Sequence, residues 1–244
     1  MSTLTAPARF RQQWLLLGSM AVLAAVSWIH MTRMAGMMPA MPAREVPFAP
    51  TFTMWSVMMV AMMLPGALPN LSAFAAYERK RVGSGSAGPY LCAAGYLLAW
   101  VGYAAAATLA QQGLHALSLL SASMHLDSPL VGGAVLLAAG TFQWSPWKAS
   151  CLRYCRSPSA SSPAAGRPAR RPRSAWGSDR GSDCIGCCWA LMLVMFVFGV
   201  MNILWMALLT LLILAEKVVG APRRLAQATG LALAAGGLWL MIGT

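Results

Sequence analysis

The sequence predicts an all-α integral membrane protein, a bundle of about six transmembrane helices in one membrane domain covering residues 1–244. Two observations predict this class. Only 10% of the residues are charged and 58% are hydrophobic, whereas a soluble domain has about 25% charged residues. The apolar residues also form continuous runs, close to the roughly 20 residues that a helix needs to cross a bilayer, rather than the alternating pattern of a strand.

Six apolar runs are long enough to cross a bilayer, and the fifth is long enough to tilt or to extend beyond it. The predicted spans are 14–29, 52–71, 90–110, 129–147, 187–215 and 225–242. The first run follows Arg9 and Arg11, which is also the pattern of a secretory signal peptide. Because no clear small-residue cleavage site follows it, we expect a retained span.

The basic residues predict how the bundle is oriented. With six spans, 13 of the 18 Lys and Arg residues fall on one side and 5 on the other. The positive-inside rule then places both termini and the loop between the fourth and fifth spans in the cytoplasm, with the spans in a bacterial inner membrane. Residues 157–183 of that loop are rich in Ser, Pro, Gly and Arg, which predicts a flexible basic segment. The net charge of +12 therefore fits loops on anionic lipid, and we do not expect nucleic-acid binding.

Five of the six cysteines flank this loop, in the stretches KASCLRYCRSP (148–158) and GSDCIGCCWALM (181–192). The first stretch has two cysteines four residues apart, and the second has three at i, i+3 and i+4, so each set lines one helix face. Thiols stay reduced in the cytosol, where such a cluster is more typical of a metal site than of a disulfide. We therefore predict a site for a soft ion, Cu(I) in preference to Zn(II). Its predicted ligands are Cys151, Cys155, Cys184, Cys187 and Cys188.

Three cations surround the first pair of cysteines: Lys148, Arg153 and Arg156. Nearby cations lower the pKa of a thiol, so we expect them to favour the metal-binding thiolate. The alternative interpretation is packing, because cysteine is a small apolar residue inside helical bundles, and this is what we expect of Cys92 in the third span.

Methionine is abundant, with 18 residues, and two groups offer thioether ligands. One lies in a predicted external loop at 30–41 and the other in the second span. Thioethers bind Cu(I) in an oxidising compartment where thiols would not survive, so external thioethers and internal thiolates would form a gradient of increasing affinity. Packing between helices is again the alternative. The secondary candidate ligands are His30, Met31, Met34, Met37, Met38, Met58 and Met62.

Catalytic constellations are not visible in the sequence. It shows no Ser-His-Asp set, paired carboxylates, phosphate-binding glycine loop or haem attachment motif. We therefore do not expect an enzyme.

Three longer stretches carry most of these features: MWSVMMVAMMLP, GTFQWSPWKASCLRYCRSP and CIGCCWALMLVMFVFGVMNILWMALLTLLILAEK. Together they resemble a bacterial family of predicted metal-binding integral membrane proteins, some of them described as copper chaperones. The resemblance implies a multi-span membrane protein whose cysteines have a metal role. Family members usually have a more ordered amphipathic segment before the second cysteine group, where this chain has RPARRPRSAWGSDRG. The motif positions that the resemblance carries over are Gln143, Lys148, Cys151, Cys155, Arg156, Cys184, Cys187, Cys188, Trp189, Asn202, Glu216 and Lys217.

The sequence thus predicts a membrane copper chaperone or transfer module that sits in lipid and passes Cu(I) to a copper-receiving membrane or periplasmic protein. Two alternatives stay open. One is a structural subunit or assembly factor of a membrane complex, whose cysteines pack helices. The other is a membrane thiol redox protein. The sequence predicts no oligomeric state.

Overall fold

The computed structural model describes residues 6–37, 47–82, 87–121, 124–156 and 172–243. Within these residues the repeating secondary structure is entirely helical, which confirms the all-α class. The helices are α1 (Ala6–Met37), α2 (Phe48–Val82), α3 (Gly88–Ala116), α4 (Pro129–Phe142), α5 (Pro146–Arg156), α6 (Arg173–Leu193), α7 (Met195–Phe198), α8 (Ile203–Val218) and α9 (Pro222–Ile242).

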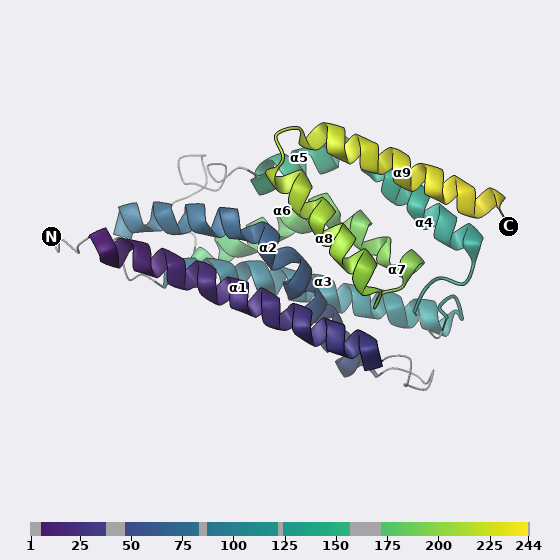
Figure 1. The fold of residues 1–244 in the computed structure, drawn as a ribbon, viewed down its shortest axis with the longest axis horizontal. Helices are drawn as coiled ribbons and strands as arrows, with labels where there is room; N and C mark the ends of the chain where they lie inside the picture. Colours follow the sequence, from purple (N-terminus) through teal and green to yellow (C-terminus); the bar gives the residue numbers. More distant parts are fainter. Residues whose placement is uncertain (1–5, 38–46, 83–86, 122–123, 157–171, 244) are drawn as a thin grey trace.

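Most of the helices run along the longest axis of the molecule, side by side (Figure 1). Within the part of the chain that the structure describes, five stretches are long and apolar enough to cross a membrane, namely those of α1, α2, α3, α6 with α7, and α9. Helix α4 is also apolar but has 14 residues, and α8 has 16. The chain is therefore compatible with a multi-pass membrane protein, as predicted.

The fifth predicted span, 187–215, is wrong as a single helix. After α7 the chain turns at Gly199, whose φ of 96° lies in the left-handed region that residues with a Cβ avoid. Asn202 then starts α8, because its side chain accepts hydrogen bonds from the backbone N–H groups two and three residues later, at 3.2 and 3.4 Å. The predicted single span is thus a hairpin of α6–α7 and α8.

This hairpin defines two ends of the bundle. At the first, which we name the cysteine end, Lys217 of α8 lies 3.0 Å from Cys184 of α6. At the opposite end, the backbone N–H of Val200 donates to the carbonyl of Met124 at 3.3 Å. Helix α1 begins toward the cysteine end and α9 ends at the opposite end (Figure 1). The start of α1 and the end of α9 thus lie toward opposite ends of the bundle, whereas the sequence-based topology, which counted 187–215 as one crossing, expected both termini on one side.

Helix α2 continues through two prolines, Pro65 and Pro69, although a proline inside a helix usually ends or kinks it. Proline has no backbone N–H, so Pro65 cannot donate to the carbonyl of Ala61 one turn earlier. The indole Nε1 of Trp28 in α1 donates to that carbonyl at 2.9 Å instead. A neighbouring helix thus satisfies the backbone group that the proline leaves unpaired, as an apolar environment requires.

Two helix pairs approach closely through glycines. On the α4–α9 pair, a Cβ added at Gly230 would lie 2.8 Å from the carbonyl oxygen of Gly140, and one added at Gly237 would lie 2.7 Å from that of Gly133. On the α3–α6 pair, a Cβ added at Gly177 would collide with the backbone of α3. Small residues at such positions let helix backbones meet, which is a main source of packing energy between helices in lipid.

Two predicted loops are shorter than expected. Helix α6 begins at Arg173, so residues 173–183 of the predicted flexible loop are helical, while 157–171 lie outside the described residues. An ion pair holds this first turn against α2, because the Nη2 of Arg173 lies 2.7 Å from a carboxylate oxygen of Glu78. The second shortened loop is the predicted external loop at 30–41, because α1 continues through residue 37.

Candidate metal centre

Three cysteines from two helices meet at the cysteine end. The Sγ atoms of Cys155 in α5 and of Cys184 and Cys187 in α6 all lie within 4.8 Å of one another. Each of the three residues, which we name the cysteine cluster, is at most 3% exposed. The sequence prediction that the two cysteine groups converge is confirmed for these three thiols, because α5 and α6 pack against each other as antiparallel neighbours.

The two helices are positioned by contacts of their own. Ser145 caps α5, since its hydroxyl accepts a hydrogen bond from the backbone N–H of Lys148 at 3.0 Å. At the other end of α5, the side-chain amide of Asn70 in α2 donates to the carbonyl of Cys155 at 2.5 Å. Helix α6 is held against α3 by the glycine contact described above. Cys155 therefore belongs to a helix that is fixed at both ends.

The two remaining predicted ligands lie beside the cluster rather than in it. Cys188 is buried one turn after Cys184 and donates to the carbonyl of Cys184 at 2.8 Å. Cys151 is partly exposed and lies against α6, where a Cβ added at Gly186 would be 2.8 Å from its Sγ. The five predicted cysteines thus form a core of three, with Cys188 and Cys151 beside it.

A cation and a phenol face the cluster. The ammonium group of Lys217 at the end of α8 lies 3.0 Å from the Sγ of Cys184. The hydroxyl of Tyr96 in α3 lies 3.2 Å from the same sulfur. Both groups can stabilise negative charge on sulfur, the form that binds a metal ion.

A buried ion pair joins α5 to α8 next to this lysine. The Nζ of Lys148 lies 2.8 Å from both carboxylate oxygens of Glu216 and also donates to the side-chain carbonyl of Gln143. The side chains of the ion pair are 1% and 2% exposed. Arg156 adds a hydrogen bond to the backbone carbonyl of Glu216 at 3.0 Å. These four residues, which we name the ionic frame, therefore fix the end of α8 and place Lys217 over the cluster.

The neighbouring sulfurs and burial shift the pKa values of the α5 thiols upward. Interactions with the sulfurs of Cys184 and Cys187 raise the pKa of Cys155 well above its usual value, and burial adds to this shift. Burial also raises the pKa of Cys151. The expectation that basic residues of α5 lower these pKa values is therefore wrong. Lys148 faces a carboxylate, and the cation that meets the thiols comes from α8.

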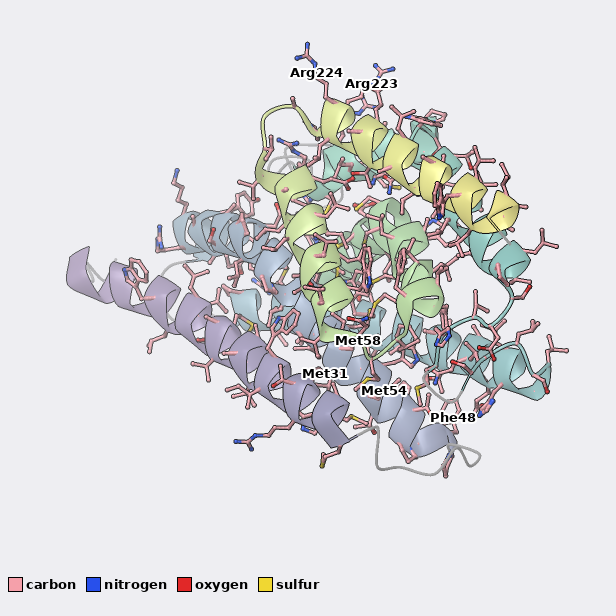
Figure 2. The ribbon with its side chains drawn as sticks, turned by 45° about the vertical axis from the view of Figure 1, so that its right-hand side comes forward. Met31, Phe48, Met54, Met58, Arg223 and Arg224 are labelled. Atoms are coloured by element: carbon pink, nitrogen blue, oxygen red, sulfur yellow. The ribbon has the colours of Figure 1, made fainter. Side chains whose placement is uncertain are left out.

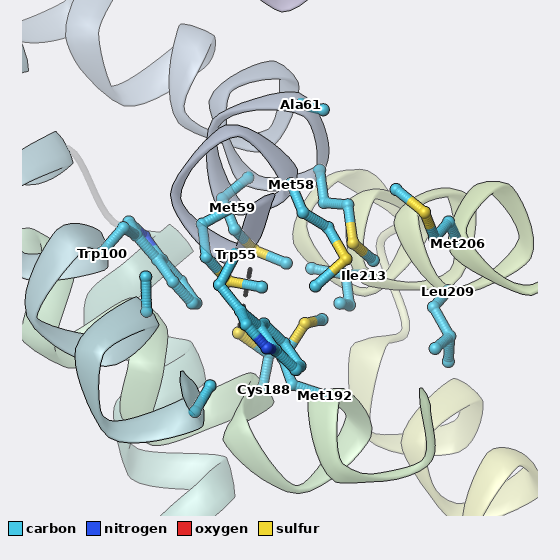
Figure 3. Packing of buried hydrophobic residues seen from close by; sticks show 14 of the residues in the cluster. Trp55, Met58, Met59, Ala61, Trp100, Cys188, Met192, Met206, Leu209 and Ile213 are labelled. Carbon is cyan, nitrogen blue, oxygen red and sulfur yellow. Dashed lines mark hydrogen bonds between the residues drawn. The ribbon is translucent and has the colours of Figure 1, made fainter. Parts of the chain in front are cut away.

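The span methionines lie in the core beside the cluster. Met58 and Met62 are at most 1% exposed, and they lie in one apolar core with the cysteine cluster. The Sδ of Met63 lies 4.0 Å from the Sγ of Cys188. Figure 3 shows Met58 and Cys188 among side chains that point into this shared core. Thioether and thiol sulfurs thus occupy one continuous buried region.

The secondary candidates of the first helix are divided by burial. Met31 is fully buried and Met34 packs against the core. His30 and Met37 are exposed, and Met38 lies outside the described residues. Burial therefore separates the described members of this group, with Met31 and Met34 in the core and His30 and Met37 at the surface.

Several residues around the cluster could not be assigned a role from the sequence. Tyr96 was not singled out and Met63 was not among the candidate ligands, because an aromatic or a methionine in an apolar span is ordinarily core. Lys217, Lys148 and Glu216 were positions carried over by the resemblance. Their pairing depends on the reversal of α8, which is encoded by the turn at 199–202.

The arrangement can bind a soft metal ion and release it by ligand exchange, because several sulfur donors lie close together in a buried site. Comparison with known proteins agrees with this chemistry. A family model described as "PpoB2: Copper chaperone" matches residues 52–240, which include the cysteine cluster and the ionic frame. Neither a curated protein nor a solved structure gives a significant match. This chain belongs to the PpoB2 family of copper chaperones.

Proposed function

We propose that this protein is a non-catalytic membrane copper chaperone that holds Cu(I) between Cys155, Cys184 and Cys187. The observation that carries the proposal is the meeting of three buried thiols within 4.8 Å of one another. Cu(I) prefers soft thiolate ligands, and a group of three suits it better than Zn(II), whose structural sites have four protein ligands. Lys217 offsets part of the negative charge that three thiolates bring into a buried site.

The sulfurs beside the cluster provide further ligands to which the ion can move. Cys188 and Met63 extend the donor set from the cluster toward the opposite end, and Met58 and Met62 follow on α2. Sulfur ligands at successive positions allow an ion to move by exchange of one ligand at a time, without a free intermediate. On this proposal Cys151 is an auxiliary, partly exposed thiol beside the cluster, and Met31 lies at the far end of the thioether series.

The charge distribution supports an orientation with the cysteine end in the cytosol. Arg223 and Arg224 lie far from Met31 and Met54 in Figure 2. Of the eleven Lys and Arg side chains that the structure describes, ten lie toward the cysteine end, and Arg33 lies toward the opposite end. The positive-inside rule then places the cysteine end in the cytoplasm of a bacterial inner membrane. The ten are Arg79, Lys80, Lys148, Arg153, Arg156, Arg173, Arg180, Lys217, Arg223 and Arg224.

This proposed orientation differs from the sequence-based topology at the C-terminal end. The N terminus stays cytoplasmic, whereas α9 ends on the outer side. Copper taken up in the cytosol at the cluster would leave toward the outer side, to a copper-receiving membrane or periplasmic protein. The bilayer supplies the apolar surroundings of the helices.

Copper retention by the detergent-purified full chain tests the proposal. Anaerobic titration with Cu(I) against a chromophoric Cu(I) chelator gives the affinity of the wild type and of the Cys155→Ser, Cys184→Ser and Cys187→Ser variants. Each single variant should lose affinity, and the triple variant should lose the buried site. Cys92→Ser is the matched control, because Cys92 is also a buried free thiol but lies outside the cluster.

The outcomes separate the three functions. Wild-type affinity in the triple variant would mean that the cluster is not the copper site. A cluster that forms a reversible Cys–Cys bond in aerobic cells and not in anaerobic cells, by mass spectrometry of alkylated thiols, would support a redox protein. Unchanged copper retention combined with loss of a co-purifying membrane complex would support an assembly factor.

A further inference from the structure

A partly open cavity of about 280 Å³ lies between α2, α3 and α6 and reaches Cys155 and Lys217. One wall is α2 from Gly66 to Tyr77, a length of about 16 Å at 1.5 Å per helical residue. Trp176, in the first turns of α6, lines the outer part of the cavity. The cavity therefore runs from the first turns of α6, near Trp176, to Cys155 at the edge of the cysteine cluster.

The cavity reaches one thiol of the cluster and not the other two. Cys155 lines it, whereas Cys184 and Cys187 do not, and these two residues are 0% and 2% exposed. Cys92 also lines the cavity but lies outside the cluster, so Cys155 is the first cluster thiol that an ion entering by this route meets. Lys217 stands at the same place, 3.0 Å from Cys184, so it lies between the cavity and the inner thiols.

The lining of the cavity indicates the kind of molecule that fits. Two cations, Arg180 and Lys217, face an otherwise mostly apolar wall that includes Leu71, Phe74 and Trp176. In a thiol-rich reducing compartment Cu(I) is bound by thiolates, and a Cu(I) ion with two thiolate ligands carries net negative charge. A volume of about 280 Å³ suits a small molecule and excludes a folded domain. Charge and size thus agree on a small anionic copper complex.

We propose that this cavity is the loading port of the copper site, and that it admits a small anionic thiol carrying Cu(I). Cys155 takes the ion by ligand exchange: a Cu–S bond to the carrier breaks as a bond to the Sγ of Cys155 forms. The thiol proton of Cys155 passes to the released carrier sulfur. Copper remains Cu(I), so the step needs neither oxidant nor reductant. Cys184 and Cys187 then displace the remaining carrier sulfur and bind the ion within the cluster; one of their thiol protons passes to that sulfur and the other to solvent. The inference rests on the proposed function, whose copper site it supplies.

Loading kinetics test the port separately from the site. The full chain in detergent is mixed anaerobically with Cu(I)–glutathione or with Cu(I)–acetonitrile, and bound copper is followed over time. Ala73→Phe fills the cavity from its α2 wall, and Ala76→Phe is the matched control on the same helix, outside the lining. Ala73→Phe should slow loading from both sources and reach the wild-type amount of copper at equilibrium. Arg180→Gln should slow loading from Cu(I)–glutathione by about tenfold, the low end for electrostatic guidance in a charged cleft.

The possible failures separate the route, the carrier and the site. Wild-type loading rates in Ala73→Phe would show that copper does not enter through this cavity. An equal effect of Arg180→Gln on both copper sources would rule out an anionic carrier. Because Arg180 also donates to the carbonyl of Tyr154, the melting temperature of that variant must be measured alongside. A wild-type chain that retains no copper from either source would overturn the proposed function rather than the port.

Discussion

The buried pair of Lys148 and Glu216 makes the most demanding prediction. Both side chains are almost fully buried and the ammonium lies 2.8 Å from both carboxylate oxygens, so replacing one partner leaves an unpaired charge in an apolar site. Removing one member of such a pair costs about 3–5 kcal/mol. We therefore expect Glu216→Gln and Lys148→Met each to lower stability by that amount. For a chain of this size, this corresponds to a fall in melting temperature of roughly 6–20 °C.

The double variant distinguishes pairing from general damage. Replacing both partners of a buried ion pair with apolar residues of similar volume is often neutral or stabilising. Lys148→Met with Glu216→Leu should therefore melt close to the wild type, within about 1 kcal/mol in a double-mutant cycle. The assay is thermal unfolding of the full chain in detergent, followed by circular dichroism, with Cu(I) affinity as a second readout. Single variants that melt with the wild type, or losses that simply add in the double variant, would refute a stabilising pair.

Three further predictions concern the packing and the topology. Gly177→Val should force α6 away from the α3 backbone, which lowers both the melting temperature and copper retention; Gly177→Ala should do so less. Trp28→Phe keeps an aromatic side chain but removes the indole N–H, which leaves the Ala61 carbonyl unpaired. The free energy of unfolding in detergent should fall by about 1–3 kcal/mol, whereas Trp14→Phe at an exposed position should leave it unchanged. Alkaline phosphatase fused after residue 242 should be active, and green fluorescent protein fused there should be dark; the reverse pattern would contradict a cytosolic cysteine end.

The helical class could be read from composition because membrane spans have a simple requirement, a continuous apolar run of sufficient length. The break of the fifth span could not, since its residues are as apolar as those of an unbroken helix. The signals are local: Gly199 adopts a positive φ and Asn202 caps the next helix. Both residue types also occur inside membrane helices. The resulting reversal also changes the number of times the chain runs along the bundle, and therefore the end of the bundle at which α9 finishes.

The site was partly predictable for a related reason. The spacing of Cys184 and Cys187 places both on one face, and a connecting loop brings α5 alongside, so the thiol cluster followed from periodicity. The contacts of Lys217 and Tyr96 with Cys184 depend on which helices become neighbours, which periodicity does not encode. The prediction of a flexible loop was wrong for residues 173–183 for the same reason. Gly177 is typical of a loop by composition, and here it lets α6 lie against α3.

The glycine contact between α4 and α9 has a consequence for biosynthesis. The ribosome makes α4 about 80 residues before α9, so the glycine face of α4 emerges without the partner that will cover it. During that interval lipid or an insertion factor must cover a short, 14-residue helix. The glycine face of α4 is covered only after α9 has been made, when Gly230 and Gly237 pack against Gly140 and Gly133. In a bilayer, completion of this side of the protein would therefore follow insertion and would depend on encounter within the plane of the membrane rather than on the order of synthesis.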